Sequence, residues 1–333
     1  MVSRATIALV GSDSLLGREI RDIVATSATG LSLRLIGADE AEAGRLTRVG
    51  DEPSLVNVLE AETLVGAQAV FLAGSSESGR KALELAGDSV TVIDLTYAAE
   101  EHPEARLRAP LVESEPEEDE GRVHVIAHPA AIALALFLRR LQAHEPVRRS
   151  VVQIFAPASE RGLAAVEELQ QQTVNLFAFK PLPKALFETQ LSFNLLARYG
   201  EEAPVSLEES ELRIERHLAT LLAFPGEGAG VPMPSLRLIQ APVFHGYSFS
   251  AWVELETNPG VEALESGLGT ETIDVRDAGL EPPNIVGQAG QGGISVGGIV
   301  PDRNNPEACW FWLVADNVRL TAQNAVAVAE QLR

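Results

Sequence analysis

The sequence predicts an α/β protein in which a domain with a doubly wound parallel sheet is followed by a second α+β domain with an antiparallel or mixed sheet. Three observations support this fold class. The chain has 333 residues, which suits two cores better than one. Apolar runs alternate with helix-like segments at first, and the pattern changes near Pro129. The expected domains are residues 1–128, completed by a C-terminal helix at 317–333, and residues 129–316.

The first domain is predicted from apolar runs that end at glycine, small or acidic residues. Continuous apolar runs are typical of parallel strands, because both faces of such strands are buried. We therefore expect strands at residues 6–10, 31–36, 69–72 and 90–93. A helix is expected after the first strand, where apolar residues recur at helical spacing: Leu15, Leu16, Ile20, Ile23 and Val24.

The second domain is predicted to begin with a helix at residues 130–141 and a strand at 150–155. Glycine-rich stretches are expected to form loops. The remaining elements expected are a helix at 162–172, strands at 236–240, 247–256 and 310–315, loops at 225–230 and 287–293, and a final helix at 317–332 whose apolar face carries Val318, Ala322, Ala325, Val326 and Ala329.

Composition indicates a soluble, cytoplasmic protein. No apolar run approaches the ~20 residues that cross a bilayer, and the first strand follows Met1 too closely for a signal peptide. The net charge of −21 disfavours binding to nucleic-acid phosphates. The densest acidic run, residues 113–120, is expected to be an exposed loop. Cys309, the single cysteine, lies in an apolar run and is expected in the core rather than as a nucleophile.

The segment Gly11–Gly17 lies between the first strand and the first helix. A dinucleotide pyrophosphate binds at this point in Rossmann-type domains, against the helix N-terminus. The outer glycines have the right spacing, and the loop residues expected at the phosphate are Gly11, Ser12, Ser14, Leu15 and Gly17. Ser14 narrows the approach to phosphate, and Asp13 adds a negative charge beside it. The alternative is that the glycines only form the turn.

Asp39 follows the second predicted strand. A carboxylate there accepts a hydrogen bond from a ribose 2′-hydroxyl and repels a 2′-phosphate, which favours NAD over NADP. The alternative for Asp39 is an acid exposed to solvent in a loop.

Several short motifs resemble those of the aspartate-semialdehyde dehydrogenases over nearly the whole chain. They are Val92-Ile93-Asp94, Pro110-Leu111-Val112, Phe193-Asn194, Ala241-Pro242-Val243, Val296-Gly297 and Asp316-Asn317-Val318-Arg319. The degenerate Usg-like paralogue group of that family is the most similar. The resemblance implies a dimerisation domain like that of glyceraldehyde-3-phosphate dehydrogenase, a homodimer, and NAD or NADP as cofactor. Ala73 and Gly74 resemble residues that line the family's cofactor groove.

The resemblance also implies that the family's catalytic side chains are replaced. In the segment Ile126–Ala133 the nucleophilic cysteine position is Ala131 and the asparagine position is His128. Alanine has no atom that forms a thioester. The glutamine that positions water and substrate falls on Ala156, and the general acid/base histidine falls on Tyr247. A phenol with a pKa near ~10 is a poor base at neutral pH.

The family's anion-binding cations are replaced as well. Their positions fall on Glu100, Glu211, Gln240 and Gly298, which reverses two charges and removes two. Arginine and lysine form charge-assisted bonds to oxyanions, whereas glutamate repels them. Aspartyl phosphate, the substrate that the resemblance implies, would therefore be bound poorly.

These features predict a catalytically inactive family member that acts as a dimeric binding or regulatory protein, with the active paralogue as a candidate partner. The alternative is an NAD(P)-dependent oxidoreductase with altered chemistry, in which His128, His245 or Tyr247 transfers protons. A third hypothesis is a pocket for a neutral or cationic ligand, suggested by Glu100 and Glu211.

Some of these side chains can also be explained by an ordinary structural role or by exposure to solvent. His128, expected at the cleft, is otherwise a hydrogen-bonded histidine at a strand end. His245 is expected on the side of Tyr247 if the strand continues through both residues. Glu211 and Glu215, one helical turn apart, form either an acid/base pair or a solvated face. The six histidines form no spacing typical of a zinc site.

Overall fold

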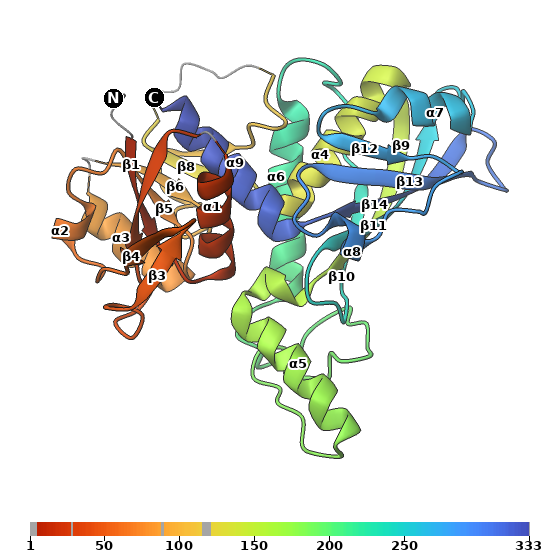
Figure 1. The fold of residues 1–333 in the computed structure, drawn as a ribbon. Helices are drawn as coiled ribbons and strands as arrows, with labels where there is room; N and C mark the ends of the chain where they lie inside the picture. The colour runs from red at the N-terminus through yellow and green to blue at the C-terminus, as the bar shows by residue number, and fades with distance from the viewer. Residues whose placement is uncertain (1–4, 28, 88–89, 115–120, 333) are drawn as a thin grey trace. The chain divides into compact units, whose positions relative to one another are not determined.

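The computed structural model describes residues 5–27, 29–87, 90–114 and 121–332. They form two compact units (Figure 1). Unit 1 comprises Met1–Ala127 together with Thr321–Arg333, and unit 2 comprises His128–Leu320. Most of the predicted acidic loop, residues 115–120, lies outside the described residues.

Unit 1 is built on a six-stranded sheet in which every neighbouring pair is parallel, in the order β2-β1-β5-β6-β8-β7. Chain order reverses between β1 and β5, so the loops after these two strands meet at the carboxyl edge of the sheet. The strands are β1 Ala5–Val10, β2 Leu31–Ile36, β5 Ala69–Leu72, β6 Thr91–Asp94, β7 Ala105–Arg108 and β8 Val123–Ile126. The α/β fold class and the parallel sheet are confirmed.

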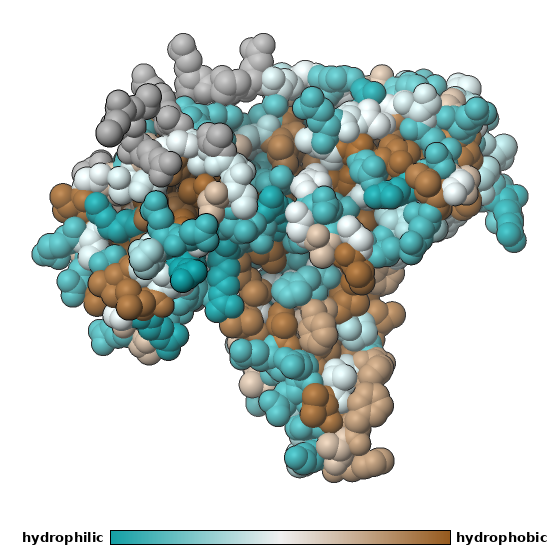
Figure 2. Space-filling model, viewed as in Figure 1, coloured by the Kyte–Doolittle hydropathy of each residue, from teal (hydrophilic) through white to brown (hydrophobic). Residues whose placement is uncertain are grey.

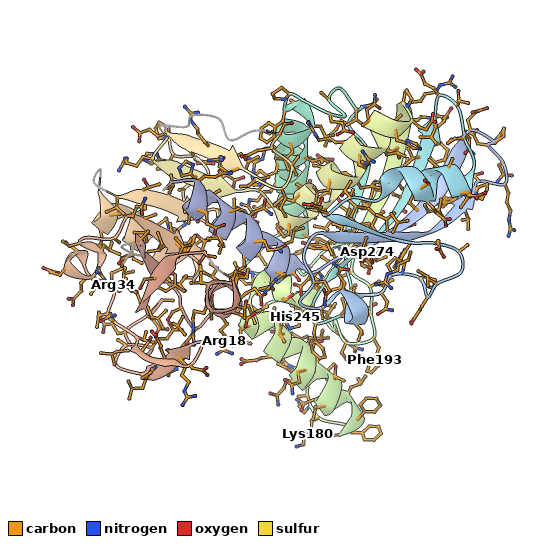
Figure 3. The ribbon with its side chains drawn as sticks, turned by 45° about the horizontal axis from the view of Figure 1, so that its top comes forward. Arg18, Arg34, Lys180, Phe193, His245 and Asp274 are labelled. Carbon is orange, nitrogen blue, oxygen red and sulfur yellow. The ribbon has the colours of Figure 1, made fainter. Side chains whose placement is uncertain are left out.

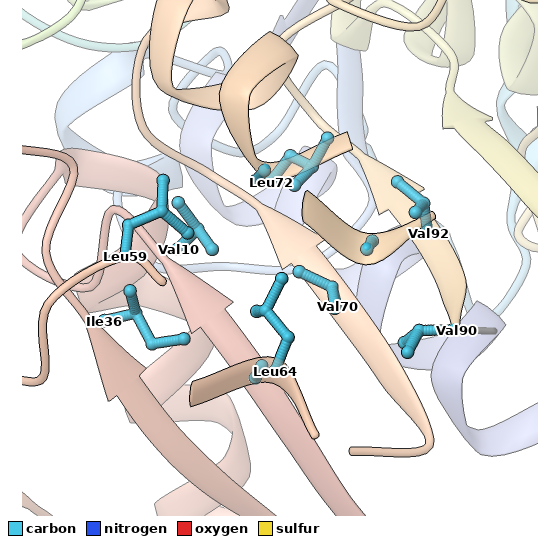
Figure 4. Packing of buried hydrophobic residues seen from close by; sticks show 11 residues of the cluster. Val10, Ile36, Leu59, Leu64, Val70, Leu72, Val90 and Val92 are labelled. Carbon is cyan, nitrogen blue, oxygen red and sulfur yellow. The ribbon is translucent and has the colours of Figure 1, made fainter. Parts of the chain in front are cut away.

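Helices bury both faces of this sheet, which explains the continuous apolar character of its central strands. Figure 4 shows side chains of β1, β2, β5 and β6 packed together, among them Val10, Ile36, Val70 and Val92. The helices of unit 1 are α1 Leu15–Thr26, α2 Ala61–Leu64, α3 Ser76–Ala86 and the part of α9 (Asn317–Gln331) from Thr321 onward. A hairpin of β3 Leu46–Val49 and β4 Glu52–Leu55 was not predicted.

Polar contacts hold the C-terminal helix within unit 1. The Asn324 side chain accepts a hydrogen bond from the Leu111 amide at 3.2 Å, and Arg108 donates to Gln331 at 2.6 Å. All members of the predicted apolar face in this unit are buried, namely Ala322, Ala325, Val326 and Ala329.

Unit 2 contains a mixed six-stranded sheet in the order β10-β9-β11-β14-β13-β12. The two edge pairs, β10 with β9 and β12 with β13, are parallel, and the central pairs are antiparallel. The strands are β9 Val147–Ala156, β10 Ser235–Gln240, β11 Tyr247–Leu255, β12 Ile273–Arg276, β13 Ile294–Pro301 and β14 Ala308–Ala315. The prediction of a mixed sheet is confirmed.

The two faces of this sheet differ. Along β11 the odd-numbered residues from Tyr247 to Leu255 are buried, and the even-numbered ones are only partly buried. On the partly buried face, called the open face here, lie Val151, Phe155, Trp252, Trp310 and Trp312. In the apolar run around Cys309, Trp310 is therefore 36% exposed because it lies on this face, whereas Cys309 is buried.

The central helix α4, Pro129–His144, explains why the predicted apolar helix has no clear polar side. It contacts β9 and two other helices, and twelve of its residues are buried. The other helical elements of unit 2 are η1 Ala158–Arg161, α5 Leu163–Phe177, α6 Leu207–Ala223, α7 Val261–Leu268 and α8 Ile285–Gln288. The predicted loop at 287–293 was partly wrong, because α8 extends into it.

Among the described residues, no helix combines the length and apolar character needed to span a bilayer.

Candidate functional site

The glycines after β1 are required by close backbone packing. Gly11 has φ +80°, and a Cβ atom there would lie 2.3 Å from the Cα of Gly74 in the loop after β5. A Cβ atom on Gly17 would lie 2.2 Å from the Gly11 carbonyl oxygen. These glycines therefore have a structural role whether or not a ligand binds, and the two loops meet at the point where Rossmann-type domains bind a dinucleotide.

Ser14 uses its hydroxyl group within the protein. Its Oγ accepts a hydrogen bond from the Gly17 amide at 2.9 Å as the N-cap of α1, and donates to the Ala73 carbonyl at 2.6 Å. An N-cap side chain satisfies one of the amides that a helix N-terminus otherwise offers to an anion. Ser14 thus reduces the donors available to a phosphate at Leu15 and beyond.

The charge of Asp13 is compensated, contrary to the expectation that it would repel phosphate. Its carboxylate forms an ion pair with Arg21 at 2.9 Å, and Arg21 also donates to the Ser12 carbonyl at 3.1 Å. Sequence reasoning missed this contact because the two residues are eight positions apart. The buried Ser12 hydroxyl has no hydrogen-bond partner among the described residues. Such a hydroxyl is compatible with a bound oxyanion.

Two carboxylates follow β2. Asp39 is exposed, and one of its oxygens accepts hydrogen bonds from the amides of Ala41 at 2.9 Å and Glu42 at 3.1 Å. Glu42, which the sequence reasoning missed, accepts from the Ala38 amide at 2.6 Å. Both acids therefore lie where a Rossmann-type domain meets the adenosine ribose.

The position of the family's nucleophile lies in the first turn of α4. His128 is the N-cap, its Nδ1 accepts from the Ala130 amide at 3.2 Å, and Pro129 follows at the first helical position. Ala131 is fully buried in this turn and presents only a methyl group. Nucleophilic catalysis by a thiolate has no counterpart at this point.

Cys309 does not replace the missing thiol. It is buried on β14 opposite Val253, which is six residues along β11 from Tyr247, a separation of about 20 Å. Burial raises the pKa of the Cys309 thiol, which a hydrogen bond with Asn258 only partly offsets. The structural interpretation of Cys309 is supported.

His128 forms a buried ion pair with Glu160. Its Nε2 lies 2.7 Å from the Glu160 carboxylate, and the two side chains are only 1% and 12% exposed. The Tyr247 ring packs edge-on against His128 with centroids 6.1 Å apart. Burial alone would raise the pKa of Glu160, but the charge and hydrogen bond of His128, then Arg161 and the Tyr247 hydroxyl, bring it below its ordinary value. Glu160 is therefore held as a carboxylate.

Arg161, the residue after Glu160, belongs to a second cluster of buried polar side chains. The Arg161 guanidinium lies 5.6 Å above the Tyr199 ring and donates to Ser210 Oγ at 2.5 Å and the Ser206 carbonyl at 3.3 Å. Burial raises the pKa of Tyr199, and the positive charge of Arg161 opposes that rise. Tyr199 is thus a neutral hydrogen-bond donor at physiological pH.

Gln240 stands at a position that the motif resemblance assigns to an anion-binding arginine, and its amide group is hydrogen-bonded within the protein through both its nitrogen and its oxygen. Its Oε1 accepts from the Tyr199 hydroxyl at 2.6 Å, and its Nε2 donates to the carbonyls of Ala156 at 2.9 Å and Ala241 at 3.2 Å. The structure thus brings together two family positions, Gln240 and Ala156. A fully bonded, fully buried amide offers no donor to a substrate carboxylate.

Glu211 on α6 has a structural role. Its carboxylate accepts from the Leu238 amide of β10 at 2.5 Å and pairs with Arg237 at 3.4 Å. The hypothesis of a Glu211–Glu215 acid/base pair is not favoured, and neither is a freely solvated face, because Glu211 is committed to β10. In unit 1, Glu100 adds to the burial that raises the pKa of Asp94.

The condition under which His245 would share the side of Tyr247 is not met, because β11 begins only at Tyr247. Gly246 between them has φ +84°, which interrupts the strand alternation, so His245 is exposed while Tyr247 is fully buried. Gly298 also has a positive φ, +56°, at an irregularity of β13. No cluster of three metal-ligating side chains occurs among the described residues.

Comparisons with known proteins identify the family that this chain resembles. The model of the family "Semialdehyde dehydrogenase, dimerisation domain" matches residues 138–320. Aspartate-semialdehyde dehydrogenase of Aquifex aeolicus is 29% identical over 98% of this chain and 97% of its own length. A USG-1 protein homolog of Pseudomonas aeruginosa is 31% identical over 79% of this chain and 78% of its own.

Solved structures show the same fold. A probable aspartate-semialdehyde dehydrogenase from Pseudomonas aeruginosa superimposes with a TM-score of 0.80 at 27% identity, covering 98% of each chain. The enzyme from Candida albicans, solved with NADP, superimposes with a TM-score of 0.69 at 13% identity, covering 99% of this chain and 100% of its own. The second likeness concerns the fold alone.

Proposed function

This chain belongs to the semialdehyde dehydrogenase family, and we propose that it is a catalytically inactive member that acts as a dimeric binding or regulatory protein. The observation that carries the proposal is Ala131, which is buried in the first turn of α4 at the position that the motif resemblance assigns to the nucleophilic cysteine. A methyl group cannot attack a carbonyl carbon, so the thioester step has no acceptor atom.

The surroundings of Ala131 support the same proposal. His128 is paired with Glu160, and Gln240 is fully bonded to Tyr199 and to the backbone of Ala156. Polar groups that already satisfy one another offer fewer free donors and acceptors to a substrate. Four functions of the family, namely nucleophile, positioner, base and anion clamp, are thus replaced together.

Restoring the thiol alone is expected to leave the protein inactive. In an assay of aspartate semialdehyde oxidation with phosphate and NAD or NADP, the wild type shows no turnover. Ala131→Cys stays at least about a hundredfold below an active enzyme, because losing a positioned base alone costs about 10²–10⁴-fold. The Aquifex aeolicus relative serves as positive control in the same assay. Wild-type turnover above the protein-free blank would overturn the proposal.

A second candidate function is an oxidoreductase with altered chemistry. The observation in its favour is the buried group of His128, Glu160 and Tyr247, which combines a potential base and acid, together with the retained backbone cradle around Gly11. This function requires a bound dinucleotide. If none of NAD, NADH, NADP and NADPH binds at millimolar concentration, this candidate is excluded.

Cofactor binding is expected to be weak and to favour NAD. Titration calorimetry should give at least about tenfold weaker binding for NADP than for NAD, because Asp39 and Glu42 would repel a 2′-phosphate. Ser14→Gly should tighten NAD binding about tenfold by freeing the Gly17 amide. The matched control is Ser27→Gly at the other end of α1, which should leave the affinity unchanged. Preference for NADP would contradict this assignment of the two acids.

The dimer surface that we propose is the open face of unit 2. Five strand spacings of about 4.8 Å and strands of about eight residues at about 3.4 Å give a face of roughly 650 Å². Stable interfaces bury about 800 Å² per partner. All three tryptophans of the chain lie on this face, and such aromatic residues are enriched at interface centres. A regulatory role through an active paralogue would use the same face in mixed dimers.

A further inference from the structure

Unit 2 carries an arm, defined as residues 163–195, that consists of α5 and the segment returning to the sheet. It leaves the sheet after β9 and rejoins it where Leu196 bridges to Gln240 of β10. Figure 1 shows α5 extending away from the rest of unit 2. Figure 3 places Lys180 and Phe193 at its free end.

The tip of the arm exposes an unusual amount of aromatic surface. Phe177, Phe179 and Phe193 are 72%, 97% and 65% exposed, and the rings of Phe177 and Phe193 meet edge to face at 5.7 Å. Val174 and Leu195 are each 57% exposed beside them. Figure 2 shows hydrophobic residues gathered along this part of unit 2. Contiguous apolar surface of this kind marks an interaction site in soluble proteins.

The arm is rigidly built beneath that surface. Gln172 is fully buried, accepts from the amides of Leu191 and Ser192 at 2.7 and 3.0 Å, and donates to two carbonyls of the return segment. Phe179 and Phe193 have backbone φ values of +55° and +59°, a range that residues other than glycine rarely adopt. Strained conformations persist where the surroundings hold them, and they concentrate at functional sites. The backbone that carries these phenylalanines is therefore held in a defined conformation.

The charge of the tip is opposite to that of the protein. Residues 169–187 contain no acid and two of the three lysines of the chain, Lys180 and Lys184, in a protein of net charge −21. The segment 262–281, at the β12 edge of the same unit, contains six acids and one arginine. A cavity of about 520 Å³ lies at that edge; Arg276 in its lining pairs with Asp274 at 2.7 Å, which leaves Glu281 beside Pro282 and Pro283 as the carboxylate without a cation of its own in the lining. This volume is within the range of about 300–1,000 Å³ typical of binding pockets.

We propose that the arm tip of one copy docks in this acidic cavity of a second copy, with Phe179 against the prolines and Lys180 beside Glu281. The proposal rests on the homodimer proposed above, and the arm lies within the matched dimerisation region. In the proposed dimer, the open faces of the two copies pack together about a two-fold axis that runs parallel to the strands. Because β10 and β12 are opposite edges of the sheet, this symmetry places the β9–β10 edge of one copy beside the β12 edge of the other. The contact then occurs twice in each dimer.

Carbodiimide cross-linking of dimers mixed from ¹⁴N- and ¹⁵N-labelled full-length protein tests the docking. We expect cross-linked peptides of mixed isotope composition that join Lys180 or Lys184 to the segment 271–281. A dimer in sedimentation velocity without such peptides overturns the docking and leaves the dimer intact. If the protein sediments as a monomer, both the docking and the proposed homodimer are overturned. The proposed absence of dehydrogenase activity does not depend on this result and is tested by the assay above.

A charge swap provides the second test. Lys180→Glu and Glu281→Lys should each weaken the dimer about tenfold, because two ion pairs per dimer become repulsive, and the doubly substituted chain should recover wild-type affinity. Phe179→Ser should weaken it about a hundredfold. Lys81→Glu, an exposed reversal on α3 of unit 1, is the matched control and should have no effect. Unchanged dimer affinity in all three variants would overturn the proposal. It would also be overturned if the protein bound phosphatidylglycerol vesicles and these variants abolished that binding.

Discussion

Replacing Glu160 with alanine is expected to destabilise unit 2 by about 3–5 kcal/mol. The substitution leaves His128 buried without its carboxylate partner, and breaking a buried ion pair by removing one member has this typical cost. Urea unfolding followed by tryptophan fluorescence measures the effect, since all three tryptophans lie in unit 2. Glu160→Gln is the matched control and should cost less, because the amide oxygen still accepts a hydrogen bond from His128.

The pH dependence of stability should follow from the same residue. The pKa of Glu160 lies below its ordinary value of 4.5 in the folded protein, so the carboxylate stabilises the fold above about pH 4.5. This contribution is lost as the pH falls through the folded pKa. The difference in unfolding free energy between wild type and Glu160→Gln should therefore shrink as the pH is lowered below about 5. A Glu160→Ala variant within 0.5 kcal/mol of wild type would show that the pair is unimportant.

Replacing Val151 with aspartate should separate the dimer. Val151 is 39% exposed on the open face and lies next to Trp252 on the neighbouring strand, so the change need not disturb the core. Two unpaired carboxylates would be buried in each dimer, which should cost about 4 kcal/mol or more, equivalent to about a thousandfold in Kd. Analytical ultracentrifugation over a concentration series measures this change.

The matched control for the dimer surface is Leu46→Asp. Leu46 is 79% exposed on the hairpin of unit 1, so the substitution adds the same charge away from the open face. It should leave the dissociation constant unchanged. If Val151→Asp sediments as the same dimer as the wild type, the open face is not the dimer surface.

The sequence predicted four of the six strands in the sheet of unit 1, because strands buried on both faces are continuous apolar runs, as in β1 and β5, but it did not predict β7 and β8. It missed β3 and β4 because Thr47, Arg48 and Glu52 give that hairpin no apolar pattern. It also missed the aromatic tip of the arm, because phenylalanine ordinarily prefers a buried position and a negative φ, and the phenylalanines of the tip are exposed, two of them with positive φ. Local pattern carries no information about such positions.

The candidate site was predicted only where a motif covers it. Ala131, Ala156 and Tyr247 were located by family motifs, and the structure shows each of them buried in unit 2. Glu160 and Tyr199 were not predicted as partners, because they are 32 residues from His128 and 41 residues from Gln240 in the sequence. A compensating contact between distant segments leaves no signal in a single sequence. The separate orientation of His245 has a local cause, namely the turn at Gly246.

The most direct test of the central claim is an intact-protein mass measurement after incubation with aspartate semialdehyde and NAD or NADP in the absence of phosphate. An active family enzyme traps the acyl group on its cysteine under these conditions and gains the mass of an aspartyl group. We predict an unchanged mass for this chain, because Ala131 offers no thiol and Cys309 is buried elsewhere. An aspartyl adduct on any residue would contradict the assignment of this protein as an inactive family member.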